Sequence, residues 1–211
     1  PIDRHRPNAG HTKYPQVRGS APAPSSEAEL FSRACALSGR PLEAVAHALH
    51  VQVPIDLSRH KGWVGGLLER ALGATAGSRS APDFEALGVE LKTIPISRTG
   101  RPRESTFLTS IAPRTLADER WPTSTVRSKL ARVLWVPIEA SPDIPLGRRR
   151  VGSPLLWSPS AEEDRALSDD FELLRRSVSE GWLDGVTAHA GQFLQVRPKG
   201  KNAAARRWTP D

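Results

Sequence analysis

The sequence predicts one α/β or α+β domain with a mixed β-sheet flanked by helices. Segments with a helical apolar period lie on both sides of segments that have the alternating or continuous apolar pattern of strands. The 211 residues are enough for one large domain, and a hydrophobic fraction of 38% is enough to build its core. The chain contains no internal repeat, so a solenoid is not expected.

The N-terminal third predicts a disordered leader followed by three short helices. Residues 1–25 are rich in Pro, Ser and Ala and have no apolar period, which favours disorder. Ser26 and Glu29 have capping-box spacing and predict a helix that ends near Gly39. Apolar spacing predicts two further helices, which are expected over residues 41–49 and 61–72.

The middle of the chain predicts three strands. Residues 89–94 alternate apolar and polar side chains and are followed by Pro95, which we expect to end the strand. A second β-rich segment covers residues 105–111. A short helix over 125–131 leads into an apolar run over 133–138, which has the length of a buried strand.

The C-terminal part predicts a long helix and then a hairpin. Ser160 and Glu163 form a second capping box, and the amphipathic helix that they open is expected to end at Gly181. Residues 185–197 have the pattern of a hairpin. The domain is therefore expected over residues 26–199, and residues 200–211 form an atypical tail without a packing pattern.

Composition excludes several classes of protein. The longest apolar runs are far shorter than the roughly 20 residues that a membrane-spanning helix needs. The single cysteine, Cys35, excludes a disulfide scaffold and a cysteine-ligated zinc site. Thirty Lys and Arg against 23 Asp and Glu give a net charge of +7, which favours a polyanionic partner such as nucleic acid.

The stretch from Asp83 to Lys92 carries the candidate chemistry. In a strand, Glu90 and Lys92 project from the same face, and Gly88 permits a turn that returns Asp83 to their side. Two carboxylates and an ammonium group at one sheet edge suit metal-assisted hydrolysis of a phosphodiester. Glu69, on the predicted helix over 61–72, could add a third carboxylate.

Taken alone, this pattern recurs by chance in charged proteins. Its simplest alternative is an exposed strand with an ordinary ion pair, and Glu69 alone is more typical of a solvated helix acid. The roles of two basic segments are also left open by the pattern alone. Residues 148–150 fit either a phosphate clamp or the basic end of a helix, and residues 197–199 fit a solvated hairpin end.

The sequence also resembles a known family, the MutH-type methyl-directed mismatch-repair endonucleases. The resemblance extends from about Glu27 to Lys199, and it is carried by four blocks, which are residues 61–69, 83–95, 149–159 and 194–199. It implies a restriction-endonuclease-like α/β fold of the PD-(D/E)xK nuclease superfamily, with a two-armed DNA-binding cleft.

The resemblance also implies roles for individual residues. Asp83 and Glu90 match metal-binding carboxylates, Lys92 matches the catalytic lysine, and Glu69 matches a helical glutamate of the same centre. Lys129 matches a lysine near the scissile phosphate. The positions that match DNA-contacting residues are Lys61, Arg197, Pro198 and Lys199.

The activity implied by the resemblance is Mg²⁺-dependent nicking of the unmethylated strand at hemimethylated GATC sites in double-stranded DNA. It further implies a cytoplasmic monomer that MutL activates after MutS has found a mismatch. After Lys199 the chain departs from the family pattern, which continues into a segment with a tyrosine that senses adenine methylation. Here the only tyrosine is Tyr14, so we expect a truncated tail.

Two alternatives stay open at this point. A GATC restriction endonuclease would cut both strands and would not need MutL. A catalytically silent DNA-binding remnant would bind DNA without a metal and would not cleave it.

Overall fold

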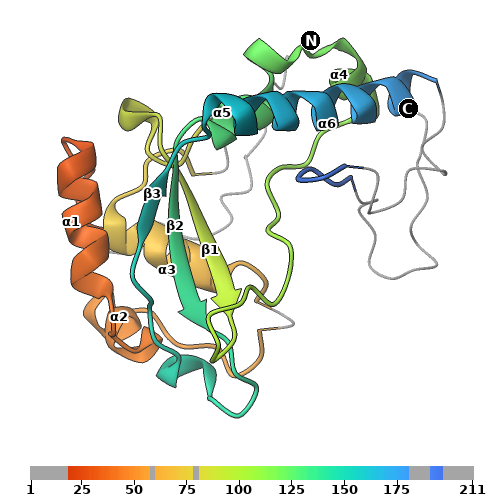
Figure 1. The fold of residues 1–211 in the computed structure, drawn as a ribbon. Coiled ribbons are helices and arrows are strands. Elements are labelled where there is room, and N and C mark those ends of the chain that lie inside the picture. Colours follow the sequence, from red (N-terminus) through yellow and green to blue (C-terminus); the bar gives the residue numbers. More distant parts are fainter. Residues whose placement is uncertain (1–18, 58–59, 78–80, 181–190, 197–211) are drawn as a thin grey trace, which may run out of the picture.

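A computed structural model describes residues 19–57, 60–77, 81–180 and 191–196 of the chain. Figure 1 shows a central sheet with helices around it. The strands are β1 (Glu90–Ile96), β2 (Val133–Glu139) and β3 (Leu155–Trp157). The α-helices are α1 (Glu27–Leu37), α2 (Leu42–Ala48), α3 (Trp63–Leu72), α4 (Pro113–Asp118), α5 (Thr125–Leu130) and α6 (Ala161–Ser179). The short 3-10 turns are η1 (Glu85–Leu87), η2 (Trp121–Thr123) and η3 (Leu146–Arg148).

The sheet is mixed, as predicted. Its strand order is β1-β2-β3. The pair β1 and β2 is parallel, with Glu90 opposite Val133 and Lys92 opposite Trp135, whereas β2 and β3 are antiparallel. Because β1 is at one edge of the described sheet, its backbone groups on the side away from β2 can be bonded by loops, as the N–H of Leu91 is by the Asp83 carboxylate.

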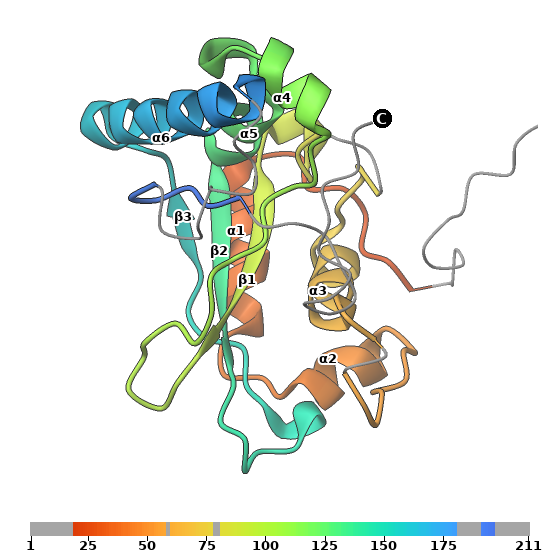
Figure 2. The same cartoon turned by 90° about the vertical axis from the view of Figure 1, so that its right-hand side faces the viewer.

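Two hydrophobic clusters lie on opposite faces of this sheet. One joins α1, α2 and α3 to Leu134, Val136 and Ile138 of β2. The other joins α4, α5, α6 and η2 to Val133, which points to the opposite face because side chains alternate along a strand. Figures 1 and 2 show α3 beside one face of the sheet and α6 crossing its upper end on the other side. The flanked mixed sheet confirms the predicted fold class, and the two-armed cleft stays a prediction.

The predicted helix starts are confirmed by their caps. The Ser26 hydroxyl accepts a hydrogen bond from the backbone N–H of Glu29 at the start of α1. At the start of α6, Ser160 and Glu163 make both bonds of a capping box. The predicted stop of α6 at Gly181 lies outside the described residues, and within them the helix ends at Ser179.

Three predictions about the strands are wrong or incomplete. β1 continues through Pro95 to Ile96, which is possible because β1 is an edge strand and Pro95 lacks only an N–H group. Residues 105–111 form no strand, since β-propensity there has no neighbouring strand to pair with. Of the predicted hairpin over 185–197, only residues 191–196 are described, and they form no strand.

The predicted leader also needs a correction at its end. Residues 1–18 lie outside the described part, but residues 19–25 pack on the domain. The Ala21 N–H donates to the carbonyl of Arg70 over 2.9 Å, and Arg33 donates to the carbonyl of Pro22 over 2.6 Å. Pro24 is buried. These contacts fix residues 19–25 in place despite their polar, proline-rich composition.

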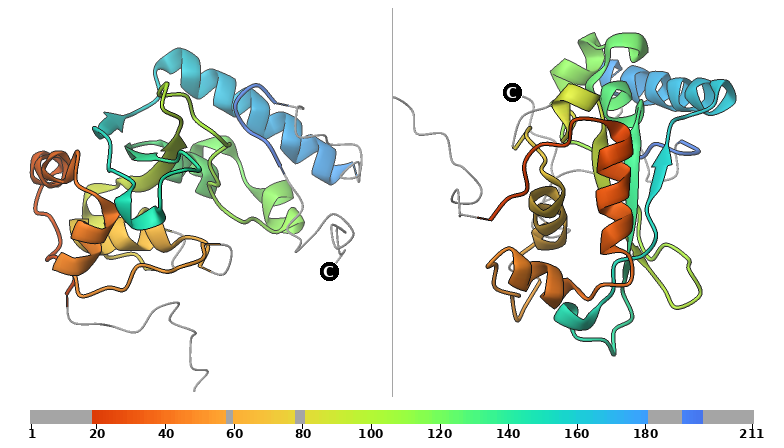
Figure 3. Two further views of the ribbon diagram at one scale, coloured as in Figure 1. Left: turned by 90° about the horizontal axis from the view of Figure 1, so that it is seen from below. Right: turned by 90° about the vertical axis from the view of Figure 1, so that its left-hand side faces the viewer.

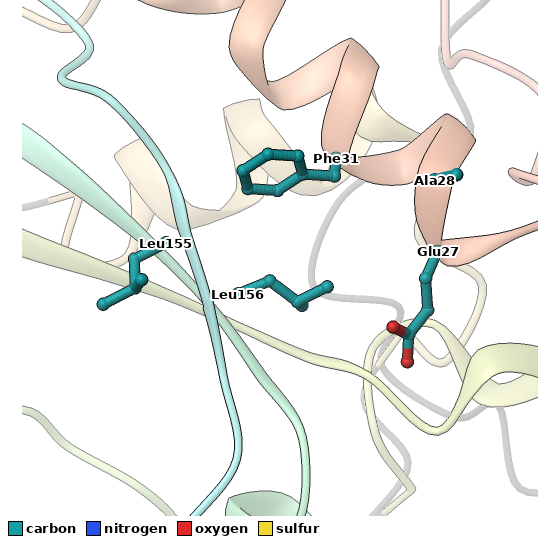
Figure 4. A pocket seen from close by; sticks show the side chains of 5 residues that line it. All are labelled: Glu27, Ala28, Phe31, Leu155 and Leu156. Carbon is teal, nitrogen blue, oxygen red and sulfur yellow. The ribbon is translucent and has the colours of Figure 1, made fainter.

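A surface hollow of about 360 Å³ lies between α1 and β3. Figure 4 shows Phe31 and Leu156 facing it, with Glu27 at its rim. It is at the opposite edge of the sheet from β1, so it is separate from the residues predicted to carry chemistry. Figure 3 shows α1 and β3 from two further sides. None of the helices in the described ranges has the length and apolar character to cross a membrane.

Candidate active site at the start of strand β1

A tight turn before β1 brings Asp83 back to the strand. Phe84 and Val89 exchange two backbone hydrogen bonds, of 2.9 and 3.3 Å, across η1. Gly88 closes this turn at φ +65°, a left-handed conformation that favours glycine. The Asp83 carboxylate then accepts a hydrogen bond of 2.9 Å on Oδ2 from the N–H of Leu91. The predicted return of Asp83 is therefore confirmed.

Glu90, the first residue of β1, is a buried carboxylate held by two lysines. Only 1% of its surface is exposed. The Lys92 ammonium donates to its Oε1 over 2.6 Å. The Lys129 ammonium, from α5, donates to Oε1 and Oε2 over 3.0 and 2.9 Å and also to the Ala81 carbonyl over 3.2 Å. Because a buried carboxylate is costly without partners, both lysines are needed to hold Glu90 in this position.

Asp83 and Glu90 repel each other inside this cluster. Burial is the largest cause that raises the pKa of the Asp83 carboxyl group, and the negative charge of Glu90 raises this pKa further. The Leu91 N–H and the charges of Lys92 and Lys129 act in the opposite direction but do not cancel the rise. The charged form of Asp83 is therefore disfavoured in this cluster, and a positive charge close to Asp83 would favour it.

The chemistry of these donors fits a divalent metal ion. Carboxylate oxygens are the ligands that Mg²⁺ prefers, and two of them meet here in a protected position. The charges of Asp83, Glu90, Lys92 and Lys129 sum to zero, so a bound cation would add an excess positive charge. Such a site suits a metal that binds together with an anionic substrate such as a phosphodiester.

The structure brings together four of the predicted site residues that it describes. Asp83, Glu90, Lys92 and Lys129 form one cluster, as described above. In the described ranges, no three His, Cys, Asp or Glu side chains are grouped closely enough to hold a metal. Glu69 therefore does not complete a three-carboxylate centre here. It lies half-buried on α3, which Figure 2 shows beside β1.

The predicted DNA-contacting residues are separate from this cluster or beyond the described part. Lys61 is exposed just before Gly62, the N-cap of α3. Residues 197–199 lie outside the described ranges.

The arginine cluster over residues 148–150 has a structural role at two of its three positions. Arg150 donates to the carbonyl of Gly39, just beyond the end of α1, over 2.6 Å. Arg149 donates to the carbonyl of Ile144 over 3.2 Å. Arg148 is exposed. Of the two open interpretations, these contacts favour the basic end of a helix over a phosphate clamp.

Comparison with known proteins identifies the family. Residues 72–170 match the family model described as "DNA mismatch repair enzyme MutH". The DNA mismatch repair protein MutH of Haemophilus influenzae is 50% identical over 183 residues, which cover 86% of this chain and 82% of that protein. The chain belongs to the MutH family. The MutH proteins of Escherichia coli K12 (50% over 191 residues, 90% and 83% covered) and Serratia proteamaculans (50% over 185, 87% and 81%) are equally similar.

Membership of the MutH family makes the chain a DNA mismatch repair endonuclease. All four clustered side chains lie within the segment that the MutH model matches. Strand alternation pointed to Glu90 and Lys92, and the turn at Gly88 pointed to Asp83. Lys129 was identified only by the resemblance, because nothing in its local sequence links α5 to β1. The carbonyl of Ala81 was missed, since a backbone acceptor leaves no sequence signal.

Proposed function

We propose that the protein nicks the unmethylated strand of hemimethylated GATC sites by metal-assisted hydrolysis of one phosphodiester bond. The single observation that carries the proposal is the buried cluster in which Asp83 and Glu90 meet two lysines at the start of β1. Its carboxylates suit a divalent cation and its ammonium groups suit a phosphate, and metal-assisted hydrolysis of a phosphodiester needs both kinds of group.

Asp83 and Glu90 would hold the metal, for which we propose Mg²⁺. When bound, this ion lowers the pKa of a water ligand and offsets negative charge on the phosphate. Oε1 of Glu90 accepts hydrogen bonds from both lysines and Oε2 accepts one from Lys129, so a cation held by Glu90 would share this carboxylate with the lysine ammonium groups. Glu69 remains a further proposed ligand from the family resemblance.

Lys92 is the proposed catalytic lysine. Its side chain is 15% exposed, and its ammonium group donates a hydrogen bond to Glu90, which sets its direction. From there it can orient the attacking water and donate a hydrogen bond to charge that develops on the phosphate. Lys129 can neutralise the same charge from α5, because its ammonium group contacts the same carboxylate.

DNA contacts are assigned by the same proposal to Lys61, Arg197, Pro198 and Lys199. Lys and Arg are the usual donors to guanine edges and phosphates, and the net charge of +7 supports binding to a polyanion. Activation by MutL after mismatch recognition by MutS, a monomeric state and a cytoplasmic location are further parts of the proposal. They are supported by membership of the MutH family alone.

A nicking assay on unmethylated, hemimethylated and fully methylated GATC duplexes, with and without MutL, tests the proposal. Asp83→Ala and Lys92→Ala should each abolish nicking and leave duplex binding largely intact, because they remove chemistry rather than the DNA contacts. Asp143→Ala is a matched control, since Asp143 is an exposed acid that contacts only Arg98 among the described residues.

Retained nicking in either of the first two variants would refute the assignment of the site. Cleavage of both strands without MutL would indicate a restriction endonuclease instead. Metal-independent binding without cleavage, even with Mn²⁺ and MutL, would indicate a silent remnant.

A further inference from the structure

A second buried carboxylate, Asp170, lies on α6 away from the cluster at β1. It is 7% exposed and is on the helix face that also buries Leu167, Phe171 and Leu174. Within the described residues no Lys or Arg forms an ion pair with it. A charged group in this position requires other partners, and all those that the structure gives it come from the backbone of one short segment.

The carboxylate of Asp170 binds three successive backbone N–H groups. Gln192 donates to Oδ1 over 2.9 Å, whereas Phe193 and Leu194 donate to Oδ2 over 2.6 and 2.9 Å. Three N–H groups that converge on one anion form a nest, and hydrogen bonds to a charged acceptor are stronger than neutral ones. The Asp170 side chain therefore ties residues 192–194 to the middle of α6.

Close packing at Gly191 supports the same conclusion. A Cβ atom at this position would lie 2.9 Å from Cγ of Asp170 and 2.4 Å from the carbonyl oxygen of Leu194. Real Cβ atoms do not approach other atoms so closely, so only glycine fits between the segment and the helix. The Leu194 side chain also packs against the hydrophobic cluster that contains α6.

The fixed segment leads directly to residues 197–199, the proposed DNA-contacting residues. Position 197 follows Leu194 by only three residues, a length of chain that spans at most about 11 Å, so the anchor at residues 192–194 is close to the proposed DNA-contacting residues along the chain. Preorganising a binding segment lowers the entropy that is lost when it contacts its ligand. The inference therefore rests on the proposed function of these residues.

The same helix is tied to the catalytic cluster. Arg127 of α5 donates from Nε to Oδ1 of Asp164 in the first turn of α6 over 3.2 Å. Asp170 follows Asp164 by six positions in the helix, which is a rise of about 9 Å along the axis. Lys129, whose ammonium contacts Glu90, is on that same short helix α5. Helix α6 thus contacts both the segment before Arg197, through Asp170, and the helix that carries Lys129, through Asp164.

We propose that Asp170 is a positioning residue for sequence recognition. By holding residues 192–194 on α6, it anchors the chain immediately before the proposed DNA-contacting residues to a helix that also contacts α5. Asp170 itself contacts neither DNA nor the reacting atoms. Its loss affects recognition of the specific site much more than general attraction to DNA, which depends on overall charge.

The test compares Asp170→Asn with the wild-type protein. The substitution keeps the shape but replaces one acceptor oxygen by an NH₂ group that faces N–H donors. The dissociation constant is measured for a GATC duplex and for a scrambled duplex of equal length. We expect GATC binding to weaken at least tenfold, scrambled binding to change less than twofold, and KM for nicking to rise more than kcat falls. Amide exchange at residues 192–194 should also accelerate.

Two other variants make the outcome specific. Asp169→Asn removes the same charge from the exposed neighbouring position on α6 and should leave the ratio of the two dissociation constants unchanged. Arg197→Ala tests the proposed function itself, and it should lower GATC binding. If Arg197→Ala has no effect, the DNA-contact assignment fails. If it lowers GATC binding while Asp170→Asn keeps the wild-type ratio, only the positioning role of Asp170 is overturned.

If Asp170→Asn does not fold, a second variant can still test the positioning role. Gly191→Ala disturbs the same contact from the side of the segment, without a change of charge. It should reduce the ratio of GATC to scrambled binding in the same direction. A Gly191→Ala protein that is folded and retains the wild-type ratio would overturn the proposal.

Discussion

Replacing Lys129 by methionine should expose how strongly the buried cluster depends on its second lysine. Methionine has a similar length and fills the same space but has no charge. The substitution leaves Glu90, at 1% exposure, with Lys92 as its only ammonium partner among the described residues. We therefore expect Lys129→Met to destabilise the folded protein in the absence of a divalent cation.

The size of the effect follows from the contacts that are lost. Lys129 contacts both oxygens of Glu90 and one backbone carbonyl, and its side chain is 9% exposed. A hydrogen bond to a charged group contributes about 1.5–3 kcal/mol, and the two bonds to one carboxylate act as one ion pair. The expected loss in unfolding free energy is about 2–3 kcal/mol, since part of the charge on Glu90 is still neutralised by Lys92.

A divalent cation should reverse much of this loss. In Lys129→Met the cluster carries a net negative charge, so Ca²⁺ supplies the missing positive charge instead of adding an excess. We expect Ca²⁺ to bind at least tenfold more tightly than to the wild type, which corresponds to about 1.4 kcal/mol. The variant should nevertheless nick poorly, because the ammonium group proposed to act near the phosphate is absent.

Urea unfolding with EDTA or with Ca²⁺ provides the measurement, with Lys61→Met as the control. Lys61 is exposed, so its replacement should change the unfolding free energy by less than about 0.5 kcal/mol. Adding Glu90→Gln to Lys129→Met should recover part of the loss, because it removes the unpaired charge. If Lys129→Met is as stable as the wild type, Glu90 is not held as described. If Ca²⁺ stabilises both proteins equally, the cation does not bind at Glu90.

Three further substitutions test stability. The pKa of Glu29 is lowered to about 2, first by its hydrogen bonds with Ser25 and then by Arg33, so this group stabilises the fold above about pH 4.5 and loses that effect as the pH falls towards 2. In Glu29→Gln, the unfolding free energy measured with urea should depend less on pH across that window than in the wild type. The same pH dependence in both proteins would contradict this prediction. Gly88→Ala should lower the unfolding free energy by about 1–2 kcal/mol, because alanine is strained at φ +65°. No steric clash adds to this cost, since a Cβ atom there would meet nothing within 4 Å. Gly65→Ala, in α3, should instead stabilise by about 0.5–1 kcal/mol in the same unfolding experiment, and equal signs would contradict the argument.

Local patterns predicted those parts of the molecule whose structure depends on nearby residues. Alternation along β1 was enough to place Glu90 and Lys92 on one face, and the glycine at 88 was enough to predict the turn to Asp83. Capping boxes identified the starts of α1 and α6 for the same reason, since the bonds span three residues.

Contacts between distant segments could not be read in this way. The strand expected over 105–111 depends on a partner strand that the fold does not provide. The burial of Glu90 depends on Lys129, which is 39 residues away in the sequence. The role of Asp170 depends on N–H groups 22–24 residues further along the chain, and backbone donors are the same for every residue type except proline.

The two edge strands of the described sheet, β1 and β3, are poorly suited to pairing with a strand of another chain. At one edge, Pro95 of β1 has no N–H group to donate, and its carbonyl already accepts a hydrogen bond from the N–H of Arg103. At the other edge, β3 has only three residues. Short edge strands and prolines are the devices by which natural proteins avoid edge-to-edge aggregation. A repair enzyme with such edges can be crowded against other proteins without forming intermolecular sheets.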